Sequence, residues 1–317
     1  MRTLFASLLL IAAVSSPQHA ADVRPTMLPW DAPLRELWQR PAEIEDQNLF
    51  DGPWDRGEAP DQSGEYVLVS RPLAGAAPQL LVADESGREW AIERTVPVRQ
   101  GYGSIEVVLS RVLSALGYHQ PPVYFVRSFT VRDSRGLHEE PGGRFRRQGG
   151  AIMLPRGGWS WEQNPFVDMR PYQGLLVVLL MFNASQIDNA NNTLYDVVRG
   201  DEAVRWYVVR DLAATLGPSG LAAGLDVESF ARGRFVTGVA RGFAQFDYAG
   251  SHQVLVRDRI TPDDVGWTSF LLDRLSEGQW QEAFRAGGYE PRIAAGFITA
   301  LRDRVALGRR IGGDDWP

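Results

Sequence analysis

The stretch that decides the fold reads Met-Phe-Asn-Ala-Ser-Gln-Ile-Asp-Asn-Ala-Asn-Asn-Thr-Leu-Tyr at residues 181–195, and Arg-Trp-Tyr-Val-Val-Arg-Asp-Leu follows at residues 205–212. The first segment starts at the end of an apolar helical run that Pro171 opens. Because this run has no polar face from Leu175 onward, it is typical of a buried helix. A loop rich in Asn and Asp follows, and then the pattern of a strand, a turn and a second strand that ends at Asp211.

Upstream of this segment the sequence predicts strands that are interrupted by one helix. Ser104 and Gly117 bracket a helical spacing of apolar residues. The turn Asp84–Gly87 joins two strand patterns into a hairpin, which is expected to stack on this helix. The Gly-, Arg- and Pro-rich segment 133–158 predicts a loop or a boundary. The strands are expected at 66–69, 79–83, 89–94 and 123–131, the last as one strand or a pair.

Downstream of Gly217 the pattern is helical to the end of the chain. Helices are expected at 226–246, 262–274, 277–286 and 290–309. Strands with one helix first, and then mostly helices, predict an α+β fold with two lobes: a small antiparallel β lobe with one helix, and a larger helical lobe. The expected organisation is a signal peptide at 1–21, a Pro- and Trp-rich extension at 22–62 that packs on the surface, the small lobe at 63–133 and the helical lobe at 134–317, with a catalytic-loop-like segment at 183–217.

This order of elements resembles the protein-kinase-like enzymes. In those enzymes a catalytic loop with an Asp and a metal-binding Asn precedes a hairpin and a metal-binding Asp. Ala91-Ile92-Glu93 resembles the Ala-Ile-Lys of the strand whose Lys reaches the nucleotide phosphates, and Glu106 stands where kinases keep the Glu that pairs with that Lys. The resemblance makes Asn191 or Asn192, together with Asp211, the ligands of a magnesium ion, with ATP as the nucleotide.

The end of the motif, residues 207–217, resembles the spore-coat (CotH-type) and HipA-type atypical kinases. The chain from about Asp46 to Arg309 is also similar to an uncharacterised family of exported bacterial proteins with a kinase-like core. The resemblance implies the two-lobed kinase fold for most of the chain, and it says less about activity.

The sequence departs from the kinase pattern at two positions. The 317 residues contain no lysine, and Glu93 stands in the position of the phosphate-binding lysine. Beside Glu106 it would put two carboxylates in one cleft. The spacing counted back from Asn191 puts Gln186 in the position of the catalytic Asp, and an amide cannot accept a proton as a carboxylate does. Asp188 is a candidate substitute.

Arg94 is a candidate for the missing cation, although strand alternation points it to the face opposite Glu93.

Three classes of function remain open. The first is an exported pseudokinase that binds a nucleotide, a metal or a partner, which could be a protein or a small molecule. The second is an active kinase or nucleotidyl-transferase that uses Asp188, Asn191 and Asp211 with magnesium. The third is a non-catalytic scaffold or adhesion domain of the cell envelope. For the Asn-rich loop alone, ordinary turn chemistry and a calcium site are rival interpretations.

Composition bears on location and partners. Arg2 and the apolar run 4–14, followed by small residues, predict a secretory signal peptide, so the mature protein is expected to be periplasmic or secreted. This run is too short to span a bilayer, and no transmembrane segment is expected in the mature chain. The chain has no cysteine, so its core alone must hold it. A formal charge of −6 argues against nucleic acid as a partner.

Overall fold

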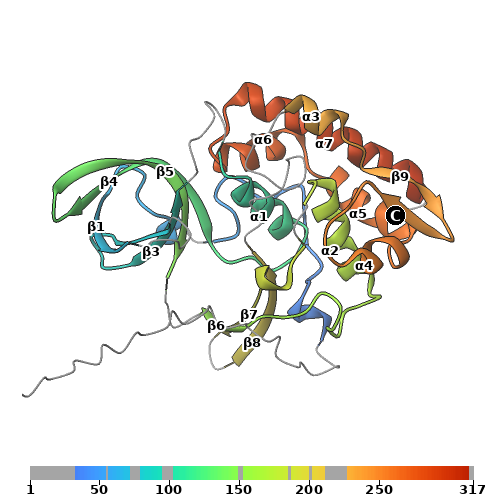
Figure 1. Ribbon diagram of the computed structural model, residues 1–317, viewed down its shortest axis with the longest axis horizontal. Coiled ribbons are helices and arrows are strands. Elements are labelled where there is room, and N and C mark those ends of the chain that lie inside the picture. The colour runs from blue at the N-terminus through green and yellow to red at the C-terminus, as the bar shows by residue number, and fades with distance from the viewer. Residues whose placement is uncertain are drawn as a thin grey trace, which may run out of the picture.

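The computed structural model describes residues 33–54, 56–71, 79–94, 103–148, 153–184, 187–199, 202–210 and 227–313. Helices and strands are both present, which confirms the mixed α and β content predicted from the sequence. Figure 1 shows a strand-rich part and a helix-rich part side by side, with helix α1 (Ile105–Ala115) between them.

Five strands form a closed barrel with the order β1-β2-β3-β5-β4. They are β1 (Glu65–Ser70), β2 (Gln79–Ala83), β3 (Glu89–Arg94), β4 (Val123–Asp133) and β5 (Gly136–Arg147). The predicted hairpin of β2 and β3 is confirmed. The expected antiparallel sheet is only partly right, because β1 and β4 pair in parallel and so close the barrel. Closure leaves fewer unpaired strand edges, which are a liability in open sheets.

The barrel has its own aromatic core. Tyr66, Trp90, Phe129 and Phe145 are buried in it, and the ring of Phe145 lies within 5.1–6.2 Å of the other three. The indole nitrogen of Trp90 donates a hydrogen bond to Asp84 in the β2–β3 turn at 3.1 Å. Aromatic burial therefore fixes the barrel interior, and the turn residue satisfies the one polar atom that this tryptophan brings with it.

The loop predicted at 133–158 is wrong, because most of this segment forms β5 and the short strand β6 (Met153–Gly157). Strand β5 therefore extends the barrel beyond residue 133. The strand is hard to predict from its sequence, because it contains Pro and Gly, which are depleted in strands. The two glycines are needed for close packing: a Cβ on Gly142 would lie 2.2 Å from the carbonyl oxygen of Arg127, and one on Gly143 would lie 2.7 Å from that of Glu93.

Helix α1 has the predicted extent, but its apolar side chains belong to the core of the helical part. We expected the β2–β3 hairpin to stack on this helix; instead α1 packs mainly against helix α6 (Glu277–Ala286), with a smaller contact to β4. The backbone nitrogen of Ser104, just before α1, donates to the carbonyl oxygen of Gly287, just after α6, at 2.7 Å. The start of α1 is thereby fixed to the helical part.

Helix α2 (Arg170–Met181) is the buried centre of the helical part, as predicted: every residue from Pro171 to Met181 is buried. Figure 1 shows the other helices around it. Helices α5 (Pro262–Asp273) and α6 each begin with a capping box, formed by Thr261 with Asp264 and by Ser276 with Gln279. Helices α3 (Val227–Arg232), α4 (Gln253–Asp258) and α7 (Pro291–Gly312) also belong to this part.

The helix predicted at 226–246 is only one short helix, α3, followed by a hairpin of β9 (Val236–Ala240) and β10 (Phe243–Phe246). Arg241 and Gly242 form its two-residue turn, and both have positive φ, at 55° and 85°. Two-residue hairpin turns favour this backbone conformation. Arg-Gly is a weak signal for such a turn, and the spacing of apolar residues around it resembled that of a helix. The prediction of one long helix was therefore wrong.

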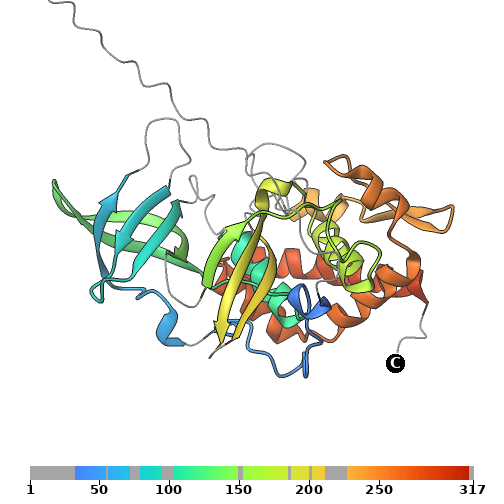
Figure 2. The same cartoon turned by 90° about the horizontal axis from the view of Figure 1, so that it is seen from below.

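A separate sheet with the order β6-β7-β8 contains the hairpin predicted after the Asn-rich loop. Its strands β7 (Asn192–Arg199) and β8 (Glu202–Val209) pair in register from Asn192 opposite Val209. Figure 2 shows this sheet on the face turned toward the viewer, between the barrel and the helices.

The residues before the barrel are anchored more deeply than the surface extension that we expected. Leu37, Ile44 and Leu49 are buried in the core of the helical part, and the side-chain nitrogen of Gln279 donates to the carbonyl oxygen of Ile44 at 2.7 Å. Two 3₁₀ helices, Leu34–Glu36 and Arg56–Glu58, lie in this region. None of the helices in the described part of the chain has the length and apolar character needed to cross a bilayer.

Arg304 in α7 joins the end of α2 to α3 and the glycine that follows it. Its Nη1 donates to the carbonyl oxygen of Met181 and to Oδ1 of Asn183, both at 2.7 Å. Its Nη2 donates to the carbonyl oxygens of Phe230 and Gly233, at 2.8 and 3.0 Å. Burial lowers the pKa of Arg304 to about 10, so the guanidinium stays charged at neutral pH. One buried cation therefore fixes the position at which the Asn-rich loop begins.

We predict that Arg304→Met lowers the free energy of unfolding by at least about 3 kcal/mol, because it removes a charged donor from four oxygen atoms, among them the buried carbonyl oxygen of Met181. The matched control is Arg302→Met, on the same helix, whose exposed side chain pairs with Glu277 at 2.5 Å; it should cost less than about 1 kcal/mol. Urea unfolding followed by tryptophan fluorescence measures both. Equal losses for the two variants would contradict the role given to Arg304.

Candidate functional site

The candidate site is built on two adjacent barrel strands and the first turn of α1. Glu93 of β3 lies directly opposite Arg144 of β5 in the strand register, and Glu106 lies in the first turn of α1. Nη1 of Arg144 donates to Glu106 Oε2, while Nη2 of the same guanidinium donates to Glu93 Oε2. Arg146, two residues along β5, donates from Nη2 to the other oxygen of Glu106. Arg144 therefore bridges two carboxylates, and Glu106 is held by two arginines.

The charges of this group, which we call the Arg144 cluster (Glu93, Glu106, Arg144 and Arg146), balance one another. The side chains of Arg144, Glu106 and Arg146 are 6%, 7% and 9% exposed, whereas Glu93 is 40% exposed. Removing charges from water is costly unless they are paired and hydrogen-bonded. The three buried members meet this condition by pairing with one another. The negative charge of Glu93 is the one that faces solvent.

The structure thus brings Glu93 and Glu106 together, as expected from the sequence, but it changes the electrostatic interpretation. We expected two unneutralised carboxylates in one cleft; the cations that neutralise them come from β5, within the segment predicted as a loop. The pattern Arg144-Phe145-Arg146 could have revealed this, because alternation puts both arginines on the face opposite a core phenylalanine.

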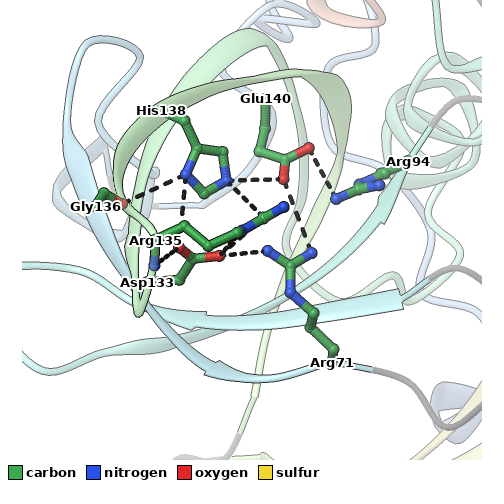
Figure 3. Close-up of polar contacts among 7 residues, drawn as sticks. All are labelled: Arg71, Arg94, Asp133, Arg135, Gly136, His138 and Glu140. Atoms are coloured by element: carbon green, nitrogen blue, oxygen red, sulfur yellow. Dashed lines mark hydrogen bonds and ion pairs between the residues drawn. The ribbon is translucent and has the colours of Figure 1, made fainter.

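Arg94, the other candidate cation, lies in a different group of charges. Its Nη2 contacts Glu140 Oε2 at 2.8 Å. Figure 3 shows these two side chains beneath the β4–β5 hairpin, beside Arg71 and Asp133. Arg135 and Arg71 donate to Asp133 at 2.9 and 2.7 Å. The hydrogen bonds from Arg135, and after them the one from Arg71, hold the pKa of that carboxyl well below its usual range. Arg94 therefore pairs with Glu140 in this second group.

Asp188, the candidate base, is half-buried and accepts a hydrogen bond from the hydroxyl group of Ser251 at 2.8 Å. Ser251 lies in the segment between β10 and α4, 63 residues along the chain. Its neighbour His252 contacts Glu162 at 3.0 Å through Nδ1. No sequence pattern pointed to the serine, because the contact joins segments that are distant in sequence. The hydrogen bond from Ser251 orients one carboxylate oxygen of Asp188.

Asn192, a candidate metal ligand, is buried at the start of β7. Its side-chain nitrogen donates to the carbonyl oxygen of Trp159 at 3.0 Å. Its Oδ1 atom is buried and has no hydrogen-bond partner among the residues that the structure describes. A carboxamide oxygen is a suitable ligand for Mg²⁺, so this atom fits a metal-binding role.

Asn191, the alternative ligand, is half-buried one residue earlier. Its carbonyl oxygen accepts a hydrogen bond from the backbone nitrogen of Arg210 at 2.8 Å. The chain immediately before Asp211 is therefore fixed beside Asn191. Gln186 and Asp211 themselves lie outside the described residues. Within the described ranges, no three His, Asp or Glu side chains are grouped so that they could hold a metal ion.

Comparisons with known proteins give little further information. No known family model matches the chain, and no curated protein matches it either. Among solved structures, the chain is similar to the crystal structure of the proinflammatory kinase CtkA of Helicobacter pylori, with 9% sequence identity and a TM-score of 0.46 over 81% of this chain and 100% of that one. This TM-score is too low to establish a shared fold.

We predict that Arg144→Met lowers the free energy of unfolding by about 3–5 kcal/mol, because it leaves two carboxylates short of a cation, one of them buried. Arg147→Met is the matched control on the same strand: its side chain pairs with Glu58 and is 34% exposed, so the expected loss is below about 1 kcal/mol. Chemical denaturation measures both.

A double-mutant cycle with Glu106→Gln tests whether the two groups act together. Glu106→Gln should cost much less in the Arg144→Met background than in the native protein, because it removes a carboxylate that has already lost one cation. Strictly additive losses would contradict the bridge.

Proposed function

We propose that the chain is an exported kinase-like protein that has lost efficient phosphoryl transfer and acts by binding, with a nucleotide as the ligand of the Arg144 cluster. The observation that carries the proposal is the bridge from Arg144 to Glu106 and Glu93. Protein kinases pair a lysine of the small lobe with a glutamate of its helix. A chain without lysine keeps such an ion pair here by taking the cation from the neighbouring strand, with Glu106 as the anion.

The same bridge supports the loss of transfer. In a kinase the lysine also contacts the phosphates of ATP. Both terminal nitrogens of Arg144 are already bonded to carboxylates, and Glu93 presents its negative charge toward solvent. A triphosphate entering at this point would meet a carboxylate first. Phosphoryl transfer depends on positioning and charge neutralisation, so a neutral cluster with an acidic rim favours weak binding over catalysis.

Magnesium would be held by Asn191 or Asn192 together with Asp211, and it would neutralise charge on the phosphates when bound. The buried Oδ1 atom of Asn192 fits this assignment. Export to the periplasm or beyond belongs to the same proposal and is supported by the signal-peptide pattern at the N-terminus.

Removing the exposed carboxylate should strengthen nucleotide binding. We predict that Glu93→Gln raises the affinity for ATP in the presence of magnesium about fivefold to tenfold, since it frees Arg144 from one carboxylate and removes a repulsive charge. Glu93→Lys should raise the affinity further.

Glu89→Gln is the matched control for this experiment, because it makes the same change of charge at an exposed position of the same strand. Its affinity for ATP should equal that of the native protein, as measured by isothermal titration calorimetry. Equal gains in ATP affinity for Glu89→Gln and Glu93→Gln would show that the effect comes from net charge alone and would contradict the role given to Glu93. No binding by the native protein or by either Glu93 variant would favour the cell-envelope scaffold.

A second candidate function is active transfer with Asp188 as the base. The hydrogen bond from Ser251 favours it, because a carboxylate whose orientation is fixed can accept a proton from a substrate hydroxyl group. We predict that the native protein shows no autophosphorylation with magnesium or manganese, measured with radiolabelled ATP.

Phosphoryl transfer by the native protein, if the Asp188→Ala variant lost this activity, would contradict the pseudokinase proposal. Ser251→Ala would then be expected to reduce the rate only partly, since it leaves the carboxylate in place. Asp196→Ala, which removes an acidic residue of β7 that pairs with Arg156 at 2.7 Å, controls for general damage to this region.

A further inference from the structure

A cavity of about 440 Å³ lies in the helical part, between the first turn of α2 and the junction of α4 with α5. Its volume is within the range of small-molecule and peptide sites. In Figure 1 these helices lie on the side of the molecule away from the barrel, and no residue of the Arg144 cluster lines the cavity. It is a separate candidate site.

Gln173 of α2 lines this cavity and is 2% exposed. Neither the oxygen nor the nitrogen of its side-chain amide has a hydrogen-bond partner among the described residues. Such an arrangement is costly, since buried amides are nearly always hydrogen-bonded. The chain also provides a contrast: Gln279 is similarly buried, but its amide nitrogen donates to Ile44 at 2.7 Å and its oxygen accepts from Ser276 at 2.9 Å. The amide of Gln173 is thus a binding group without a partner inside the protein.

The charges around the cavity select the kind of ligand. Arg259 is occupied by Asp168, to which it donates at 2.7 Å, and Asp264 accepts from the backbone of Thr261. Asp258, at the end of α4, is exposed and forms no ion pair or hydrogen bond with the described residues. Counting Arg170, the lining carries two positive and three negative charges. This balance disfavours a phosphate group and leaves Asp258 as a partner for a cation.

We infer that this cavity binds a segment of a basic peptide. A peptide group offers a donor and an acceptor side by side. These are the two hydrogen-bond partners that the amide of Gln173 lacks among the described residues. A neighbouring Arg or Lys side chain of the ligand would pair with Asp258. The inference does not depend on nucleotide binding at the Arg144 cluster.

The test uses the blocked tripeptides acetyl-Gly-Arg-Gly-amide and acetyl-Gly-Glu-Gly-amide, titrated into the mature protein and followed by NMR. The Arg peptide should bind at least about tenfold more tightly than the Glu peptide. Gln173→Leu should weaken the Arg peptide by about tenfold, and Asp258→Asn should remove most of the preference for Arg. Gln279→Leu is the matched control and should leave peptide affinity unchanged.

Thermal unfolding without peptide provides an independent readout. Gln173→Leu should raise the melting temperature or leave it unchanged, because it replaces an unsatisfied amide with an apolar group of similar shape. Gln279→Leu should lower it. The inference is overturned if the native protein does not bind the Arg peptide, if Gln173→Leu binds it as well as the native protein, or if Gln173→Leu lowers the melting temperature as much as Gln279→Leu.

Discussion

One guanidinium shared between two carboxylates connects the barrel to the rest of the molecule. Arg144 comes from β5, Glu93 comes from β3, and Glu106 belongs to a helix whose apolar face is part of the helical core. Because the start of α1 is also bonded to the turn after α6 through Ser104, the Arg144 cluster fixes the barrel strands relative to the helices. Buried charges tolerate little displacement, since an unpaired charge costs far more than a lost apolar contact.

The absence of lysine gives this cluster its chemical character. An ammonium is a compact point charge on a flexible stem, whereas a guanidinium presents several donors in a fixed plane. Arg144 can therefore bond two carboxylates at once with different nitrogens. Because both terminal nitrogens bond to carboxylates of the protein, they are not available to another anion. An ion pair built from arginine is thus compatible with a stable fold, and under the proposed function it accounts for weak binding of phosphate.

Local patterns predicted most single elements correctly. The β2–β3 hairpin, helix α1, the buried helix α2 and the β7–β8 hairpin follow from alternation, helical spacing and turn residues. The proximity of Glu93 and Glu106 followed from a resemblance to kinases. Strand β5 was missed although Arg144-Phe145-Arg146 alternates, because Gly142 and Gly143, which are typical of turns, serve here the close approach of neighbouring backbones.

Contacts between segments that are distant in sequence could not be predicted from sequence patterns either. The parallel pairing of β1 with β4 closes the barrel across some sixty residues of chain. Ser251 reaches Asp188, and Arg304 reaches Asn183, only after the helices have packed. The unpartnered amide of Gln173 is likewise a property of the packed fold, because any glutamine in an apolar helix has the same appearance in the sequence.

The measurement that tests the central claim most directly is NMR of the arginine guanidinium groups, with and without ATP and magnesium. The account predicts that the Nη protons of Arg144 rotate and exchange slowly, because both terminal nitrogens are bonded to carboxylates and the side chain is 6% exposed, and that ATP shifts these signals. Averaged, rapidly exchanging signals like those of the exposed Arg302 would contradict it.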